Sequence, residues 1–166
     1  MSMNRTALEL KFYPDSVLRK KAQPVKKFDE ELRQILKEMA QIMYKSKGVG
    51  LAANQVGLDL SLLVADAGDR LYKLVNPKIV LKQGKEIMEE GCLSLPGICV
   101  EVKRAKKIKV QAQDEYGNPL IIETEDLLSR ILQHEIDHLQ GKLIIDYVGF
   151  FKRIILKNKI KKIDSR

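Results

Sequence analysis

The sequence contains no tryptophan, and aromatic residues make up only 5% of its 166 residues. A chain of this length can bury one sizeable core, which must then consist mainly of leucine, isoleucine and valine. No apolar run is long enough to cross a bilayer, so the sequence predicts no transmembrane segment. It also shows no internal repeat and no low-complexity linker, which favours a single folded unit.

Cysteine is scarce, and the two cysteines are Cys92 and Cys99. The chain shows no secretion signal, and cytosolic thiols stay reduced, so we expect no disulfide between them. Cys99 lies in a stretch, 98–102, that alternates like a short strand, and a small apolar side chain is its simplest role there. Cys92 lies among glycines, a serine and a proline, which mark a turn. A thiol in a turn can be aimed at a helix that folds over it.

Histidine is equally scarce, and the two histidines, His134 and His138, stand four residues apart with Glu135 between them. This is an H-E-x-x-H pattern. On a helix, residues at this spacing share one face, with Cβ atoms about 6 Å apart. Two imidazoles placed in this way can bind one metal ion, and Glu135 can reach a water on it. The alternative is a pair of surface histidines on a charged helix, and these five residues alone do not decide.

A catalytic metal ion usually takes three protein ligands and keeps one position for water. Metalloproteases with this pattern take the third ligand from a downstream glutamate, or from a histidine six residues after the second one. No glutamate follows Glu135, no histidine follows His138, and Ile144 occupies the place of the third histidine. The third ligand must therefore come from upstream, and the candidates are Cys92 and Cys99.

Hydrophobic periodicity predicts a scaffold of helices and strands. Asp29 is the expected N-cap of a helix that runs to about Lys45. Its expected buried stripe consists of Leu32, Ile35, Leu36, Met39, Ile42 and Met43. We expect strands at 60–65 and 71–75, a pair of strands at 79–81 and 86–88 around Gly84, and a hairpin that joins 108–112 to 120–122 through a turn at 116–119.

The H-E-x-x-H pattern falls on a second predicted helix. Thr124 is its expected cap, and two acidic residues in its first turn suit the helix dipole. Its expected inner side consists of Leu127, Leu128, Ile131 and Leu132. Gly141 is a suitable stop just past its end. Packing of this helix against strands would hold the histidines rigidly, which matters because small misplacements of catalytic groups are costly.

A glycine-rich segment at 48–53 fits a loose dinucleotide-binding fingerprint. That fingerprint requires a strand before it and a helix after it. Here a helix is expected before it, so we expect no nucleotide cofactor.

Three motifs occur in order: GVGLAANQ at 48–55, EGCLS at 90–94 and QHEIDHLQG at 133–141. Together with YPD at 13–15 and LR at 18–19, they resemble the peptide deformylases, enzymes that remove the formyl group from the starting methionine of new bacterial proteins. The resemblance covers nearly the whole chain. It implies an α+β fold of mixed, mainly antiparallel strands around a central metal-binding helix, with a C-terminal amphipathic helix. Residues 1–146 would be the catalytic domain, and 147–166 a basic helix or tail of the same domain.

The resemblance also implies a ligand set and a base. Cys92, His134 and His138 would bind one divalent ion, often Fe²⁺ in the family, although Zn²⁺, Ni²⁺ and Co²⁺ suit the same ligands. Glu135 would be the general base. The substrate would be the N-formyl-methionyl end of a nascent peptide in the cytoplasm.

Further roles follow from the same resemblance. The side-chain amide of Gln55 and the backbone N–H of Leu93 would stabilise the oxyanion, although Gln55 taken alone would pass for a polar loop residue. The resemblance also implies that Glu90 pairs with Arg104. Asp137 projects from another part of the helix than the histidines, so we expect it to form a structural salt bridge or hydrogen bond. Residues that match positions beside the substrate are Gly50, Val49, Leu127 and Ile131, of which the last three also suit ordinary packing.

Other functions predict different behaviour. A general metallopeptidase would cleave internal peptide bonds and use a third ligand other than Cys92. A ribosome-associated protein with a structural metal would use four protein ligands, and Glu135 argues against it because such a site needs no base. A thiol enzyme that pairs Cys92 with His134 would survive chelation and lose activity on alkylation.

The net charge is +8, and residues 147–166 carry seven basic residues against one acid. Apolar residues of this segment are spaced for an amphipathic helix: Phe150, Phe151, Ile154, Ile155, Ile160 and Ile163. One interpretation is a packed helix with a solvated basic face. Another, implied by the resemblance, is docking on ribosomal RNA, for which phosphate attraction supplies the physical reason. Binding to an anionic membrane is a third.

Overall fold

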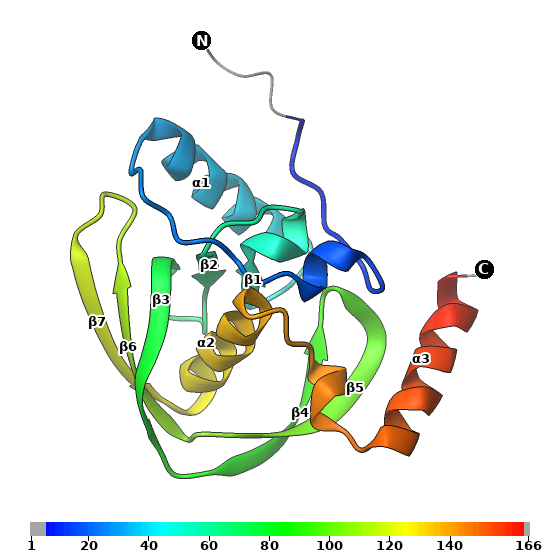
Figure 1. Cartoon of the computed structure of the whole chain (residues 1–166). Helices are drawn as coiled ribbons and strands as arrows, with labels where there is room; N and C mark the ends of the chain where they lie inside the picture. The colour runs from blue at the N-terminus through cyan, green and yellow to red at the C-terminus, as the bar shows by residue number, and fades with distance from the viewer. Residues whose placement is uncertain (1–5, 165–166) are drawn as a thin grey trace.

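A computed structural model describes residues 6–164, which form three α-helices, three short 3-10 helices and seven strands (Figure 1). The helices are α1 (Glu30–Lys45), α2 (Asp126–Leu139) and α3 (Phe150–Asp164), and the 3-10 helices are η1 (Ser16–Arg19), η2 (Ala53–Val56) and η3 (Ile144–Tyr147). The strands are β1 (Gly50–Ala52), β2 (Leu62–Ala65), β3 (Tyr72–Gln83), β4 (Glu86–Cys92), β5 (Leu95–Arg104), β6 (Lys107–Gln113) and β7 (Pro119–Glu125). The predicted α+β class is confirmed.

The strands form two antiparallel sheets. Five strands pair in the order β1-β2-β3-β6-β7, and β4 and β5 form a separate two-stranded sheet. Helix α2 lies in the middle of the molecule and packs its apolar side against strands of the larger sheet (Figure 1). The predicted central helix and the predicted β6–β7 hairpin are therefore confirmed.

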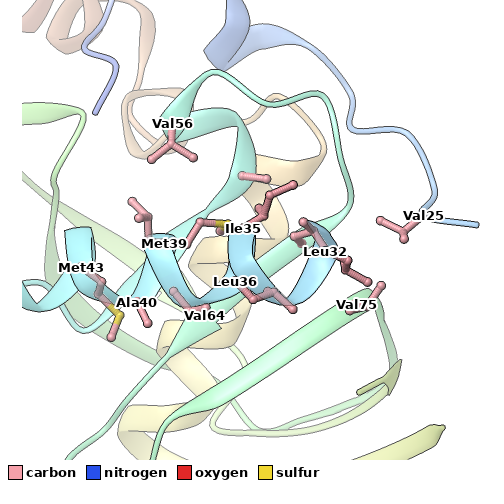
Figure 2. Close-up of a cluster of buried hydrophobic side chains, with 13 residues drawn as sticks. Val25, Leu32, Ile35, Leu36, Met39, Ala40, Met43, Val56, Val64 and Val75 are labelled. Carbon is pink, nitrogen blue, oxygen red and sulfur yellow. The ribbon is translucent and has the colours of Figure 1, made fainter. Parts of the chain in front are cut away.

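Helix α1 packs on a second cluster of buried side chains, shown in Figure 2. Asp29 caps the helix, because its carboxylate accepts the backbone N–H of Leu32 at 3.0 Å. Five of the six residues of the predicted stripe are buried, and Ile42 is partly buried against the same cluster. The stripe faces Val64 of β2 and Val75 of β3, so α1 packs directly against the larger sheet.

The predicted pairing of residues 79–81 with 86–88 is wrong. Strand β3 continues through the first segment and pairs with β6, whereas β4 pairs with β5. Gly84, with φ +67°, lets the chain turn out of one sheet and into the other. β3 pairs with a strand that lies beyond β4 and β5 in the sequence, and β4 pairs with the strand that follows it, so the short hairpin does not form. Local sequence does not encode that choice.

The start of α2 also differs from the prediction. Thr124 still belongs to β7, and the N-cap position is Glu125, which makes no side-chain capping bond. The β6–β7 ladder extends as far as the pair Lys107 and Glu125, so strand pairing overrides the capping preference of threonine. Leu127, expected on the inner side, is 50% exposed, while its three expected partners are buried. The helix ends as predicted, before Gly141 at φ +74°.

The predicted C-terminal helix is present as α3, but its apolar residues do not lie on one side. Leu156 and Ile160 are buried against the cluster that includes β5 and η3. Phe150 and Phe151 are 70% and 80% exposed. The helix is also tied to the start of β5, because Lys159 Nζ donates to the carbonyl oxygen of Gly97 at 3.3 Å.

Candidate metal centre and active site

Three segments that are far apart in the sequence meet at one point. Helix α2 carries His134 and His138 on the face that its i, i+4 spacing predicts. Cys92 ends β4, where the β4–β5 ladder shifts register directly after Gly91. Gln55 lies in η2, directly after the short strand β1. The structure therefore brings together all three sequence motifs.

The sulfur and the two imidazoles converge. Cys92 Sγ lies 3.2 Å from His138 Nε2, which lies 3.2 Å from His134 Nε2. All three ligand atoms lie within 4.8 Å of one another. Bonds of about 2.0 Å to nitrogen and 2.3 Å to sulfur would separate ligands on neighbouring corners of a tetrahedron by about 3.3–3.6 Å. Donor type and spacing thus fit a transition-metal ion with Cys92 and both histidines as ligands.

The carboxylate of Glu135 lies beside this centre. Its side chain is buried, and Oε2 has no hydrogen-bond partner among residues 6–164. Burial raises the pKa of Glu135 to about 7, although the nearby positive charges of His134 and Arg104 act in the opposite direction. A buried carboxylate with an unused oxygen and a pKa near neutrality is suited to exchanging a proton with a group in the site.

A second carboxylate, that of Glu90, lies behind His134. Oε2 of Glu90 is 3.0 Å from His134 Nδ1, and the same carboxylate accepts both Nε–H and Nη2–H of Arg104 at 2.8 and 2.9 Å. Burial alone would raise the pKa of Glu90, but hydrogen bonds from Arg104 and His134 lower it to about 2. Asp137 is 2.6 Å from Arg104 Nη1. The predicted Glu90–Arg104 pair and the predicted salt bridge of Asp137 are therefore confirmed.

The two histidines have opposite electrostatic surroundings. Burial alone would lower the pKa of His134, but hydrogen bonds with Cys92 and Glu90 raise it to about 10. Burial and the adjacent positive charge of His134 hold the pKa of His138 well below its usual value. The Nδ1 atom of His134 thus has a carboxylate partner, whereas that of His138 has no hydrogen-bond partner among residues 6–164.

Arg130 was not identified from the sequence, yet it is part of this network. Its Nη1 donates to Glu90 Oε1 at 2.7 Å and to the Val102 carbonyl at 3.0 Å. Its Nη2 donates to the carbonyl of Glu86 at 2.9 Å. The available signal was spacing, because Arg130 stands one helical turn before His134 and so shares its face.

Gln55 is buried next to the sulfur. Its Nε2 is 3.6 Å from Cys92 Sγ and 3.2 Å from Ser94 Oγ, while its Oε1 accepts the N–H of Ala52 at 2.9 Å. The last of these bonds fixes the orientation of the amide, so the N–H₂ end faces the centre. Gln55 is thus a held side chain rather than a mobile loop residue.

A cavity of about 450 Å³ opens onto this centre. Its lining includes every predicted site residue except His138: Val49, Gly50, Gln55, Cys92, Leu93, Leu127, Ile131, His134 and Glu135. Val49 and Leu127 are each half exposed and stand on its rim, whereas Ile131 is buried in its wall. The exposure of Leu127, which contradicts its expected place in the core, agrees with a position beside a bound molecule.

Comparisons with known proteins all lead to one family. Residues 7–153 match a family described as polypeptide deformylase. A peptide deformylase from Thermoanaerobacter pseudethanolicus is 50% identical over 149 residues, which cover 90% of this chain and 94% of that protein. The crystal structure of a peptide deformylase from Legionella pneumophila has a TM-score of 0.91 at 42% identity and covers 96% of each chain. A peptide deformylase from Synechococcus elongatus, solved in complex with actinonin, has a TM-score of 0.86 at 39% identity, over 96% of this chain and 89% of that one.

Proposed function

We propose how this chain, which belongs to the peptide deformylase family, carries out its reaction: Cys92, His134 and His138 hold one divalent metal ion, and Glu135 acts as general base. The chain is a metal-dependent hydrolase that removes the N-terminal formyl group from formyl-methionine of newly made proteins and releases formate. The observation that supports these roles is the convergence of one sulfur and two imidazole nitrogens beside a buried carboxylate with an unpaired oxygen.

When bound, such an ion would act as a Lewis acid and lower the pKa of a water molecule to about 7. Glu135 accepts a proton from the attacking water, and the resulting hydroxide adds to the formyl carbon. The carbonyl oxygen becomes an oxyanion, towards which Gln55 donates an N–H from its side chain and Leu93 one from its backbone. Loss of one such donor typically costs about 3 kcal/mol of transition-state stabilisation. Glu135 then gives the proton to the departing amine as the C–N bond breaks.

We assign the cavity to the methionine side chain and the first peptide units of the substrate. Its apolar rim and wall, formed by Val49, Leu127 and Ile131, would take up an unbranched apolar side chain. Gly50 would let the extended backbone of the substrate lie close to β1.

The two cysteines allow a matched test of the ligand set. Protein prepared without oxygen should contain one ion per chain and release formate from a formyl-methionyl peptide. Cys92→Ala should lose both properties, whereas Cys99→Ala, a change at the exposed thiol of the same hairpin, should retain the ion. Equal metal content in the two variants would refute the proposed ligands. The metal found in the native sample tests our further proposal that the ion is Fe²⁺ rather than Zn²⁺, Ni²⁺ or Co²⁺.

We further propose that residues 147–166 belong to the same domain as 1–146 and that α3 docks on ribosomal RNA. Lys152 and Lys161 are exposed on α3, and Phe150 and Phe151 next to them are largely uncovered. The double change Lys152→Glu with Lys161→Glu should weaken ribosome binding and flatten its salt dependence. A similar double change at Lys26 and Lys37, exposed residues far from α3 in sequence, is the control. Equal binding of both variants would defeat the docking proposal.

We place the enzyme in the cytoplasm, where formylated chains are made. Among residues 6–164, no helix has both the length and the apolar character that a membrane span requires.

A further inference from the structure

The two histidine rings are held differently on the side away from the sulfur. His134 Nδ1 lies 3.0 Å from a carboxylate oxygen of Glu90, so its second nitrogen has a partner. His138 Nδ1 is buried and has no hydrogen-bond partner among the described residues. A histidine that binds a metal through Nε2 carries its proton on Nδ1, and that N–H almost always donates to an acceptor. The His138 ring therefore needs an acceptor for its Nδ1–H.

Asn54 has a buried acceptor, Oδ1, that also lacks a hydrogen-bond partner. Within residues 6–164, two buried side-chain oxygens lack a partner, Asn54 Oδ1 and Glu135 Oε2. Glu135 belongs to the cavity wall, whereas Asn54 is 1% exposed and lies outside the cavity. Asn54 already touches His138, because its Nδ2 donates to the backbone carbonyl of that residue. An unpaired donor and an unpaired acceptor thus belong to two buried residues in contact.

The same contact determines which way the Asn54 amide faces. The carbonyl oxygen of His138 accepts hydrogen bonds only, so it must meet the N–H₂ end of the amide and not Oδ1. Gly141 donates its N–H to the same carbonyl at 2.9 Å, which gives this oxygen two donors. Oδ1 shares a carbon with Nδ2, so it lies next to this contact with the His138 backbone. In this structure neither Oδ1 nor His138 Nδ1 forms a hydrogen bond, to the other or to any residue in 6–164.

We propose that Asn54 is a positioning residue of the metal centre: its Nδ2 holds the His138 carbonyl, and its Oδ1, unpaired in this structure, accepts the Nδ1–H of His138 when Nε2 binds the ion. This inference rests on the proposed function, because it concerns His138 as a metal ligand. The two bonds select the tautomer that leaves Nε2 free for the ion, and they anchor the last turn of α2 to η2. Asn54 and Gln55 are neighbours in η2, so one short segment supports both His138 and Cys92.

The presence of only two histidines makes a direct test possible. The full chain, labelled with ¹⁵N in histidine and loaded with Zn²⁺, should give two sets of ring signals in long-range ¹H–¹⁵N correlation spectra. We expect the Nε2 signals of both rings to shift on addition of Zn²⁺, and both rings to keep a slowly exchanging Nδ1–H. The Nδ1–H of His138 should show a nuclear Overhauser effect to the side-chain amide protons of Asn54. This measurement needs no substitution, so it does not depend on the folding of a variant.

Two substitutions at the same position separate the roles of the amide. Asn54→Leu removes both bonds at similar volume, and we expect exchange of the His138 Nδ1–H to accelerate and Zn²⁺ affinity, measured by competition with a chelator, to fall by about 10–100-fold. Asn54→Asp keeps an acceptor and should retain the protected proton. Asn76→Asp, at an amide that also bonds a backbone carbonyl but lies outside the cavity and the metal-binding group, should leave both rings unchanged.

The outcomes distinguish this inference from the proposed function. If neither Nε2 signal of the wild-type protein responds to Zn²⁺, the ligand set is wrong and the role of Asn54 falls with it. If both respond but the His138 Nδ1–H exchanges freely or shows no effect to Asn54, the ligand set stands and the role of Asn54 is overturned. An unchanged His138 Nδ1–H in Asn54→Leu would overturn it in the same way.

Discussion

The backbone of Gly50 runs so close to the carboxylate of Glu135 that a β-carbon at position 50 would overlap Oε1. Gly50 lies in β1 and does not have a positive φ angle, so its backbone conformation does not require glycine. The close approach of Glu135 is what excludes a larger residue. Strand β1 therefore forms one wall of the space in which the proposed general base lies.

Gly50→Ala should move Glu135 and so impair the reaction. A displacement of about 1 Å at a catalytic group can cost about 100-fold in rate, and we expect a loss of this order in kcat/KM for formate release. Metal content should change little, because the ligands lie on other elements. Gly149→Ala is the matched control, since a β-carbon there meets nothing within 4 Å. Similar kinetics for both variants would contradict the close approach.

Glu135→Gln tests the role of the base separately from the ligands. The amide has almost the same shape as the carboxylate but cannot accept the proton of the attacking water. General-base catalysis contributes about 10²–10⁴-fold, so formate release should fall by at least that factor while the protein still binds one ion per chain. Near-normal turnover in a variant with full metal content would refute the mechanism.

The burial of Glu135 also makes a prediction for the metal-free protein. Its pKa is about 7 in the folded state, against an ordinary value of 4.5. Between these two values the folded chain holds a proton that the unfolded chain has released, so stability falls as pH rises through this window. Glu135→Gln removes the cost of ionising this buried carboxyl. The free energy of unfolding of the variant should therefore exceed that of the wild type by an amount that grows from pH 4.5 to 7 and reaches about 3 kcal/mol.

Urea unfolding of the metal-free proteins at pH 5 and pH 8 measures this difference. Glu101→Gln, at an exposed glutamate of β5, is the control and should follow the wild type at both values. If Glu135→Gln differs from the wild type by the same amount at pH 5 and pH 8, the raised pKa is wrong.

The sequence was most informative where chemistry depends on local spacing. The i, i+4 relation between His134 and His138 follows from helix geometry alone, and the helix is where periodicity predicts it. The meeting of Cys92 with these rings depends on two sheets and a register shift, which no local pattern encodes. Here elimination had left two cysteines as candidates, and the motif resemblance selected Cys92.

The predictions were wrong where strand pairing overrides the local preference of a residue. Gly84 suggested a short hairpin, but β3 and β4 each gain a longer partner elsewhere. Thr124 is a good cap residue, yet the ladder with β6 keeps it in a strand. Arg130 and Asn54 were missed for a related reason: their partners are backbone carbonyls and carboxylates that become neighbours only after folding. Hydrophobic periodicity does not predict which polar residues become buried beside a functional site, because their partners come from distant parts of the chain.

Arg130→Met tests whether this network braces the metal centre. The change keeps an unbranched apolar stem but leaves the Glu86 and Val102 carbonyls without their guanidinium donor, and Glu90 with one guanidinium fewer. Removal of one partner from a buried ion pair typically costs about 3–5 kcal/mol, and we expect the lower end because Arg104 still holds Glu90. Zn²⁺ affinity should fall by about tenfold or more, since Glu90 orients His134.

The matched control for Arg130→Met is Arg33→Met, which breaks the Arg33–Glu30 pair on the surface of α1. An exposed pair contributes at most about 1 kcal/mol, and Arg33 is remote from the ligands in sequence, so Zn²⁺ affinity should not change. Urea unfolding of the metal-free variants gives the stability difference, and chelator competition gives the affinity. If Arg130→Met loses no more stability than Arg33→Met and binds Zn²⁺ as tightly as the wild type, the guanidinium of Arg130 does not hold the β4–β5 hairpin against α2.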